Sequence, residues 1–516
     1  VINKRLCLYL DGQFGAVLKD WHNARQQRLE QDRQTRATTP EQQLEYGVQL
    51  LKQGRISKGL GIIEGLGQAS ACDPAIREQM REQFSDHERD GSVLPFRPPR
   101  PMLELDKEVF EEAVKELDPL KAVSVRNHKP DCIKSLLRGN FETDGEAADA
   151  LDWQRKLGES YFNGVMPKWL RRRINRGLCT PLVKKAAPEG ETPDARPVCS
   201  RDSDIITWSR CLTMQATAPF CERVEPQQLA VGVSGGCEIK ILGLNLELEA
   251  REREGADFIN VALDMKNAHS SFSRVAAQKA LDLMAAGSSS LLALAQGIWA
   301  DTSFPIDVYM RGHTFEFEHL KSFTAGGPQG SPMSNFAFPA AIDHALKSTI
   351  TKYPEVHISA IQDDIDLCGP PESVFGDAST GGDDQGALVH LLAELEKVQL
   401  EPNRKKFQAY ATTGEAWSYA EASGYGWLPR PFYVTDDDAR ARIEALERLA
   451  KDAAARAAQA GAGSQAKRAA REAAAAAKNA RREVPEGGRA YGIITCGAAV
   501  GSAEWKAHYL REKGKE

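Results

Sequence analysis

The stretch "HISAIQDDIDLCGPP", residues 357–371, carries two adjacent aspartates at the joint between two short apolar runs. Apolar and polar residues alternate before the joint, as they do in a half-buried strand, and Gly-Pro-Pro ends the second run. The pattern predicts strands near 356–362 and 365–368, with Asp363 and Asp364 where they join. Two neighbouring carboxylates repel each other, and partial burial raises the cost of each charge. Either a positive group lies beside the pair, or the pair points into water.

A second predicted strand also ends in a carboxylate, in "DFINVALDMKNAHSSFSRV" (257–275). The β-rich run near 258–263 leads to Asp264, and a helix is expected to begin near Ser271–Ser273. On its own, Asp264 could simply cap the next turn. If both strands belong to one sheet, Asp264 and Asp363 come within a few ångströms of each other. Carboxylates in that arrangement would hold Mg²⁺, and two ions about 4 Å apart would activate a hydroxyl and stabilise a leaving pyrophosphate.

A glycine-rich turn precedes a predicted helix near 332–351, in "FTAGGPQGSPMSNFAF" (323–338). Its glycines allow close approach to the backbone, Ser331 is expected to be the helix N-cap, and Pro332 suits the first helical position. A phosphate or a base pair could rest at such a helix start. A plain turn before a helix is the alternative interpretation.

Together and in this order, the three stretches resemble motifs A, B and C of reverse transcriptases from non-LTR (LINE-like) retrotransposons. The matching segments are "LDMKNAHSSF", "GGPQGSPMS" and "IQDDI". Further blocks are similar to the same family: "DARPV" (194–198) to a segment of the fingers, "LAVGVSGGCEIKI" (229–241) to its Gly-Gly segment, "LEPNRKKF" (400–407) to motif D, and "YGIITCGAAVGSAEW" (491–505) to the approach to the thumb. The resemblance covers roughly 105–430 and 485–516, and more weakly 40–90.

This resemblance implies an α+β fold, that of a right-hand polymerase with fingers, an antiparallel palm sheet and the start of a thumb. It divides the chain into five parts, which are a helical N-terminal region and linker (1–100), a helical lead-in to the fingers (101–178), fingers and palm (179–435), an Ala/Arg-rich helical insertion (436–484) and a palm-to-thumb segment (485–516).

The resemblance also implies roles for individual residues. Asp264, Asp363 and Asp364 would be the catalytic, metal-binding carboxylates for two Mg²⁺ ions, with Mn²⁺ as a substitute. Lys406 would lie near the leaving pyrophosphate as a candidate proton donor. The residues expected to bind the nucleotide are Lys184, Lys185, Arg196, His269, Gln329 and Gly330. The implied partners are an RNA template, a DNA primer and dNTPs, without a membrane, and the implied location is intracellular, in the nucleus.

Three positions depart from the family pattern. His269 stands where the family has Phe or Tyr to exclude a ribose 2′-hydroxyl, so weaker selection of dNTPs over rNTPs is expected. Ile361 replaces the usual aromatic residue before the aspartate pair. Pro339 lies inside the predicted helix of motif B, where it should bend or break that helix.

Composition bounds the class of protein. With 42% hydrophobic and 27% charged residues, the 516-residue chain resembles soluble multi-domain proteins, and no apolar run approaches bilayer-spanning length. Ten cysteines without a Cys-x-x-Cys pair argue against a disulfide framework and a zinc knuckle. The net charge of −6 disfavours a protein that coats nucleic acid by bulk electrostatics.

Two basic tracts stand out against this acidic mean. Residues 168–185 contain seven Lys/Arg and no acid, and 440–482 contain eleven Lys/Arg and four acids. The first tract is expected to contact the template backbone, with a merely solvated helix as the alternative. The second should form an exposed helical hairpin, because few apolar residues could anchor it. Other helices are expected near 107–117, 129–138, 146–174, 204–218, 236–250, 272–285, 289–300 and 385–399, and other strands near 180–184 and 307–318.

Four functions remain open from the sequence. An active RNA-directed DNA polymerase is the first, and a decayed or domesticated palm that still binds nucleic acid is the second. An RNA-directed RNA polymerase shares the carboxylates but is less similar to "PQGSP" and "GVSGG". A metal-dependent nuclease would need neither the glycine-rich turn nor the fingers.

Overall fold

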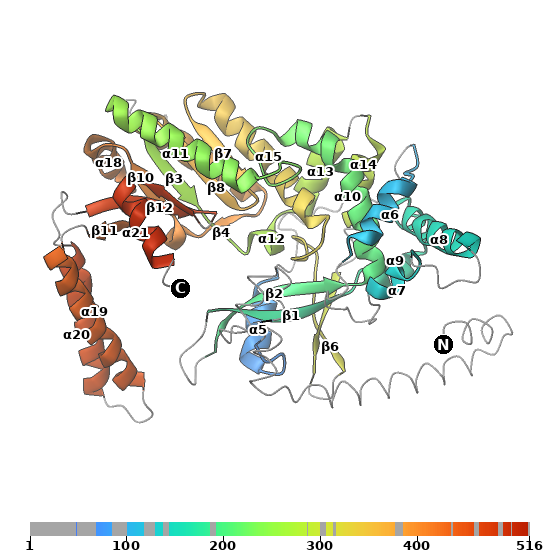
Figure 1. Ribbon diagram of the computed structural model, residues 1–516, viewed down its shortest axis with the longest axis horizontal. Coiled ribbons are helices and arrows are strands. Elements are labelled where there is room, and N and C mark those ends of the chain that lie inside the picture. Colours follow the sequence, from blue (N-terminus) through green and yellow to red (C-terminus); the bar gives the residue numbers. More distant parts are fainter. Residues whose placement is uncertain are drawn as a thin grey trace.

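The computed structural model describes residues 48, 69–84, 101–117, 130–137, 144–185, 192–285, 287–299, 306–312, 316–376, 385–434, 437–458, 464–482, 489–496 and 498–513. Helices and mainly antiparallel sheets form an α+β fold, as expected (Figure 1). Three expectations, an amphipathic helix over 41–67, a linker over 93–102 and a loop over 376–386, lie wholly or almost wholly outside the described residues. No described helix is long and apolar enough to cross a bilayer.

The aspartates belong to a four-stranded antiparallel sheet, here called the carboxylate sheet. Its strand order is β10 (Gln408–Ala411), β3 (Ile259–Leu263), β8 (Asp364–Gly369) and β7 (His357–Ile361). β7 and β8 form the expected hairpin, and β3 lies beside β8. Both faces of the sheet are covered, which explains why β3 reads as the nearly continuous apolar run "INVAL".

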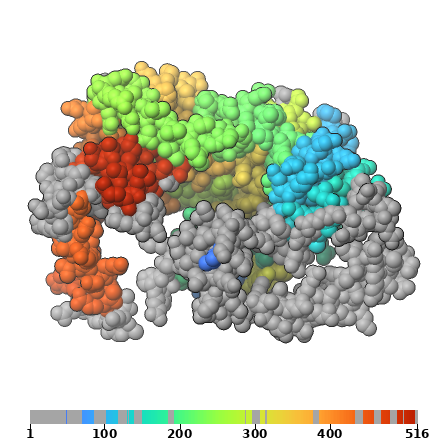
Figure 2. Space-filling view, viewed as in Figure 1, coloured from blue at the N-terminus to red at the C-terminus, as the bar shows by residue number. Residues whose placement is uncertain are grey.

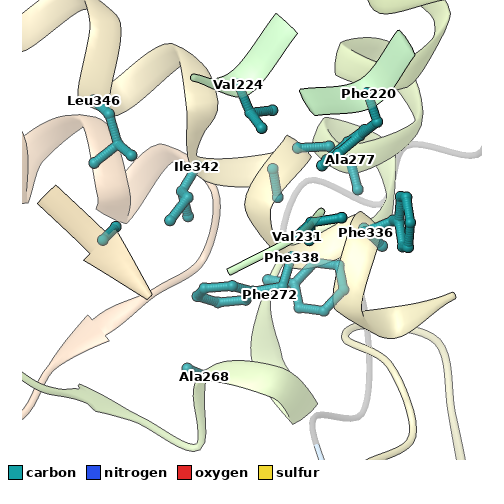
Figure 3. Close-up of a cluster of buried hydrophobic side chains, with 14 of the residues drawn as sticks. Phe220, Val224, Val231, Ala268, Phe272, Ala277, Phe336, Phe338, Ile342 and Leu346 are labelled. Atoms are coloured by element: carbon teal, nitrogen blue, oxygen red, sulfur yellow. The ribbon is translucent and has the colours of Figure 1, made fainter. Parts of the chain in front are cut away.

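One face of the carboxylate sheet packs against a helical layer that contains most of the hydrophobic core. In Figure 3, Phe336, Phe338 and Ile342 of one helix lie among aromatic and aliphatic side chains from several other segments, which include Phe220, Val231 and Phe272. The layer comprises α10 (Ser203–Val224), α13 (Arg274–Met284), α14 (Ser289–Trp299), α15 (Ser334–Lys352), α16 (Pro371–Phe375), α17 (Gly386–Lys397) and α18 (Gly414–Ala420).

The other face is covered by α11 (Gly236–Glu254) and a C-terminal hairpin. Leu244 and Leu248 of α11 share a cluster with Tyr410 of β10 and with Ile493 and Val500 of the hairpin. The C-terminal elements are β11 (Phe432–Val434), β12 (Arg489–Thr495), β13 (Ala498–Gly501) and α21 (Ala503–Lys513).

A second four-stranded sheet has the order β2 (Asp194–Arg201), β1 (Gly177–Lys185), β5 (Ile306–Arg311) and β6 (Phe317–Phe323). The region 307–318, expected as one strand, is therefore divided between two paired strands. α5 (Pro74–Glu82) packs on this sheet through Ile76 and Met80. Asp73 begins α5 by accepting a hydrogen bond from the Ala75 amide, and Pro74 occupies the first turn.

In the part of the chain that the structure describes between α5 and β1, four helices follow one another: α6 (Lys107–Lys115), α7 (Pro130–Lys134), α8 (Asp144–Phe162) and α9 (Lys168–Ile174). The single helix expected over 146–174 is wrong. Gly164 has a φ of 72° and Pro167 precedes α9, so the chain leaves the helix between them. The short remaining elements are β4 (Met265–Lys266), α12 (Ala268–Ser271), β9 (Glu401–Pro402), the 3₁₀ turn η2 (Arg404–Lys406) and the π turn η3 (Glu421–Tyr425).

Two helices between β11 and β12 form an arm that projects from the body (orange in Figures 1 and 2). α19 (Asp437–Ala458) and α20 (Ser464–Arg482) are the helical hairpin expected over this region. Leu449 is 56% exposed, whereas Ile443, near the base of the arm, is buried against Phe432 and Ala480. Val434 pairs with Arg489, so the arm is inserted at the tip of a strand hairpin.

Pro339 was expected to bend or break α15. The helix is not broken there, since it continues to Lys352. A second expectation about α15 is wrong. Ser331 is not its N-cap, because the helix begins three residues later, at Ser334, after a turn closed by the Ser334 amide and the Ser331 carbonyl.

Candidate active site

The register of the carboxylate sheet brings the three predicted aspartates to one edge. Leu263 of β3 pairs with Ile365 of β8, so the next positions, Asp264 and Asp364, follow side by side. Ile361 pairs with Asp364 in the β7–β8 hairpin, which puts Asp363 at its turn. The convergence expected from the sequence is therefore present in the backbone.

Electrostatics reflect this convergence. Desolvation raises the pKa of Asp364, and the nearby carboxylates of Asp363, Asp366 and Asp264 raise it further, while Lys240 acts in the opposite direction. The charge of Asp364 is thus costly in the absence of a cation. A positive group, Lys240, therefore does lie near the adjacent aspartates, but it does not cancel the repulsion between their carboxylates.

Asp264 has partners from the segment after α17. The side-chain amide of Asn403 donates to the Asp264 carboxylate at 2.9 Å, and the backbone N–H of Asn403 donates to the backbone carbonyl of Asp264 at 2.8 Å. Lys406 pairs with the same carboxylate at 3.4 Å, and 64% of the lysine side chain is exposed. Lys406, expected near the leaving group, therefore does lie beside a predicted metal ligand.

A cavity of about 370 Å³ opens beside these groups. Asp264 and Asp364 line it together with Lys405, Lys406 and Thr495. Carboxylates and ammonium groups in one cavity suit a ligand that carries both a divalent cation and phosphate oxygens.

A buried ionic network supports β8 from the α11 side. Lys240 pairs with Asp366 at 2.7 Å and also donates to the Asp364 carbonyl at 2.7 Å. The Lys240 and Asp366 side chains are 0% and 1% exposed. Asn260 of β3 and Thr495 of β12 donate to the Asp366 carboxylate at 2.9 and 2.7 Å. One lysine thus fixes the backbone at Asp364 and neutralises the carboxylate two residues further on.

Gln362 anchors the tip of the hairpin to α15. It has a φ of 55°, and its amide donates to the Gln228 side chain at 3.0 Å. Its own side chain donates to the Asn335 carbonyl at 3.1 Å. That carbonyl would normally accept from the residue four positions later, which is Pro339 and has no N–H. The proline that departs from the family pattern therefore leaves an acceptor that Gln362 uses.

The glycine-rich turn docks onto the segment that follows Asp264. The Gly326 amide donates to the Phe272 carbonyl and the Gly327 amide to the His269 carbonyl, both at 2.7 Å. Gly326 has a φ of 62°, and a Cβ there would lie 2.2 Å from the Ser270 backbone, so this close approach requires glycine. Arg274 adds a bond from its Nε to the Gly326 carbonyl at 2.7 Å.

His269 accepts a bond from this turn and lies near Asp363. Its ring packs on Phe338 with centroids 5.1 Å apart. Burial lowers the pKa of His269, and the Asp363 carboxylate opposes that shift. The position expected to face the sugar thus lies within electrostatic reach of Asp363.

Gln329 and Gly330 connect the turn to the second sheet, where the Cys199 amide donates to the Gln329 carbonyl at 3.2 Å. Arg196 is exposed on β2 opposite Leu182, and Lys184 and Lys185 end β1. Arg196 forms no ion pair with any residue that the structure describes. The proposed phosphate-binding side chains therefore belong to a different sheet from the aspartates.

No three His, Cys, Asp or Glu side chains in the described ranges are grouped closely enough to hold one ion. The donors at the sheet edge are nevertheless the hard oxygens that Mg²⁺ prefers, and Mg²⁺ commonly takes only one or two protein carboxylates and completes its shell with water and substrate phosphates. The residues present therefore suit that ion.

Comparisons with known proteins add a distant structural likeness. No family model matches the chain, and no curated protein matches it. A solved structure of apo telomerase from Candida tropicalis, truncated from the C-terminal domain, is similar with a TM-score of 0.33 and 10% identity, over 46% of this chain and 50% of that one. The chain thus spans half the length of that neighbour, and a likeness this weak carries no conclusion about function.

The residues that support the aspartates could not be recognised from the sequence alone. Lys240 lies in the quoted segment "GGCEIKI", and Asn403 in "EPNRKKF", but neither received a role. A lysine on a helix with few charged neighbours was the available signal for Lys240. Its partner could not be read from sequence, because 124 residues separate it from Asp364.

Proposed function

We propose that this chain is an RNA-directed DNA polymerase of the non-LTR retrotransposon type. The observation that supports it best is the meeting of Asp264, Asp363 and Asp364 at one edge of an antiparallel sheet, with the glycine-rich turn docked on the segment after Asp264. In this proposal the carboxylate sheet is the palm, the second sheet belongs to the fingers, and the substrates are an RNA template, a DNA primer and dNTPs.

The carboxylates of Asp264 and Asp363 would hold two Mg²⁺ ions, with Asp364 as a helper. When bound, these ions would lower the pKa of the primer 3′-hydroxyl and neutralise charge on the phosphates. Lys406, which is largely exposed beside Asp264, would protonate the leaving pyrophosphate. Gln329 and Gly330 would line the nascent base pair, and Arg196 with Lys184 or Lys185 would hold the triphosphate.

Primer extension on poly(rA)/oligo(dT) with dTTP tests this function. The wild-type chain should extend the primer with Mg²⁺ or Mn²⁺, and Asp363→Asn should lower the rate by about 100-fold or more, because carboxylate-held metal contributes several kcal/mol to the transition state. Asp452→Asn, an exposed carboxylate on the α19 helix, is the matched control and should retain full activity. Absence of extension by a folded wild-type chain would refute the proposal.

His269 favours a second candidate, an RNA-directed RNA polymerase, because a histidine excludes a 2′-hydroxyl less effectively than a larger aromatic ring would. Extension with rUTP as efficient as with dTTP would favour that candidate. His269→Phe should then restore preference for dTTP if the residue gates the sugar, and should leave the ratio unchanged if it does not. Tight template binding without any extension would instead indicate a decayed palm.

A further inference from the structure

A second cavity, of about 550 Å³, lies at the junction of α9 with strands β5 and β6, away from the aspartates. It is lined by arginines and rings: Trp169, Arg172, Arg173, Arg176, Tyr309 and His319, together with Asp307 and Ser322. Its volume is within the range of about 300–1,000 Å³ that is common for ligand sites.

The tryptophan of this cavity is largely exposed. Trp169 is 66% exposed and lies on α9 between Lys168 and the arginine run that begins at Arg171. A large ring left in water at the mouth of a cavity costs solvation free energy, which a flat aromatic partner would recover. Tyr309 and His319 add rings to the same cavity and meet edge to face with centroids 5.5 Å apart.

The cavity is also cationic, because its carboxylate is already neutralised. Asp307 is 5% exposed, accepts two bonds from Arg172 at 3.2 and 3.3 Å, and accepts one from Ser322 at 2.8 Å. Arg173 and Arg176 form no ion pair with any described residue, and Arg176 lies over the Tyr309 ring at 5.3 Å. Positive charge at this cavity therefore remains available to an anionic ligand.

We propose that this cavity binds an unpaired segment of a nucleic-acid strand, with one base stacked on Trp169 and the adjacent phosphates paired with Arg173 and Arg176. The combination of an exposed ring with guanidinium groups is the one that single-strand sites use, since every base offers a flat face and every linkage a charge. Inside a duplex the base faces are covered by their neighbours, so a paired strand could not use the indole in this way.

The position of the cavity agrees with a strand that continues to the candidate active site. α9 leads directly into β1, β1 pairs with β2, and β2 contacts Gln329 through the Cys199 amide. The inference rests on the nucleic-acid part of the proposed function but not on its chemistry.

Fluorescence anisotropy with labelled oligouridylate and oligothymidylate tests the site, with a labelled duplex for comparison. Trp169→Ala should weaken single-strand binding by about 5- to 150-fold, the range found when one stacking ring is removed, and should leave duplex binding unchanged. Trp169→Phe should retain most of the affinity. Trp153→Ala is the matched control, because Trp153 is 70% exposed on α8 and does not line the cavity.

Arg173→Gln and Arg176→Gln test the phosphate contacts. Each should reduce the slope of log affinity against log salt by about 0.7, the value for one contact to a single strand. Equal binding by Trp169→Ala and Trp153→Ala would overturn the proposal. A wild-type affinity for oligonucleotides that salt does not change would also overturn it, because the phosphate contacts would then be absent.

The two proposals fail separately. Asp363→Asn should lower the rate of extension by about 100-fold or more but should retain Trp169-dependent binding in full. If the chain extends primers but Trp169→Ala binds single strands as well as the wild type does, only the cavity proposal is refuted. If binding depends on Trp169 but the chain does not extend primers, only the polymerase proposal is refuted.

Discussion

Two lysines pair with aspartates of the same sheet in opposite environments. Lys240 and Asp366 are both essentially inaccessible to solvent, whereas Lys406 and Asp264 are 64% and 29% exposed. The buried lysine also holds a backbone carbonyl, and its aspartate accepts two further bonds. The exposed lysine contacts one carboxylate at the longer distance of 3.4 Å.

The difference in burial indicates which of the two ion pairs can separate when a ligand binds. Removing one partner of a buried pair leaves an uncompensated charge in a low dielectric, so the Lys240 pair is a fixed part of the fold. An exposed pair gains little free energy and can separate, so Lys406 can leave Asp264 to a cation or move toward a phosphate. On the side of α11, Lys240 holds the backbone at Asp364 in place. On the side of Lys406, Asp264 remains accessible to ligands.

Lys240→Met should have the largest effect on stability. The change leaves the buried charge of Asp366 without a partner and should lower the free energy of unfolding by about 3–5 kcal/mol. Urea denaturation followed by circular dichroism measures it. Adding Asp366→Asn to this variant removes the stranded charge and should recover part of the loss. A cost below about 1 kcal/mol for Lys240→Met would contradict the role given to the buried pair.

Gln362→Ala should have an intermediate effect, about 0.5–1.5 kcal/mol, because the Asn335 carbonyl loses its donor. Pro339→Ala supplies a helical N–H to that carbonyl, so Gln362→Ala should cost less in the Pro339→Ala background. A double-mutant cycle on urea unfolding gives the coupling energy. Additive effects would show that the proline and the glutamine act independently.

Lys406→Ala should change the free energy of unfolding by less than about 1 kcal/mol, since its pair is exposed. In primer extension, by contrast, loss of a proton donor should slow the chemical step by about 100-fold. Single-turnover rates separate this step from product release. Lys405→Ala, a neighbouring cation that also lines the cavity, serves as the comparison and should retain a faster chemical step.

Asp364→Asn should produce the smallest change, a slight stabilisation at pH 7 without divalent cations. The folded-state pKa of Asp364 is raised above its ordinary value of 3.8, so its ionisation opposes folding at neutral pH. Below the ordinary value the carboxyl is protonated in both states, and the difference from wild type should vanish there. Thermal unfolding from pH 3 to pH 8 measures it, and a stabilisation that grows as pH falls would contradict this sign.

Local patterns predicted those parts of the fold that local forces decide. The strands around Asp264 and Asp363 have alternating or continuous apolar residues with clear ends, and the α19–α20 arm has an almost uniform helix-forming composition. The single helix expected over 146–174 could also have been corrected from local sequence, because Gly164 and Pro167 are signals of a helix break. For the candidate site, the sequence supplied the three aspartates and Lys406.

Long-range contacts account for what was not predicted. Thr495 binds Asp366 across 129 residues, and Gln362 finds Asn335 only because α15 lies beside the hairpin. Pro339 was expected to damage its helix, yet its missing donor is compensated by a side chain from another element. Such compensation depends on tertiary packing, which no single-sequence periodicity encodes.

The insertion point of the arm has a consequence for how this protein can vary. Val434 and Arg489 pair directly across the whole of α19 and α20, so the strands close whether the excursion between them is long or short. The returning strand then reaches Thr495, which is tied to the buried pair beneath Asp364. The arm can therefore be lengthened, shortened or replaced without disturbing the aspartates of the carboxylate sheet. The length of the arm is thus free to change with the partner that it contacts.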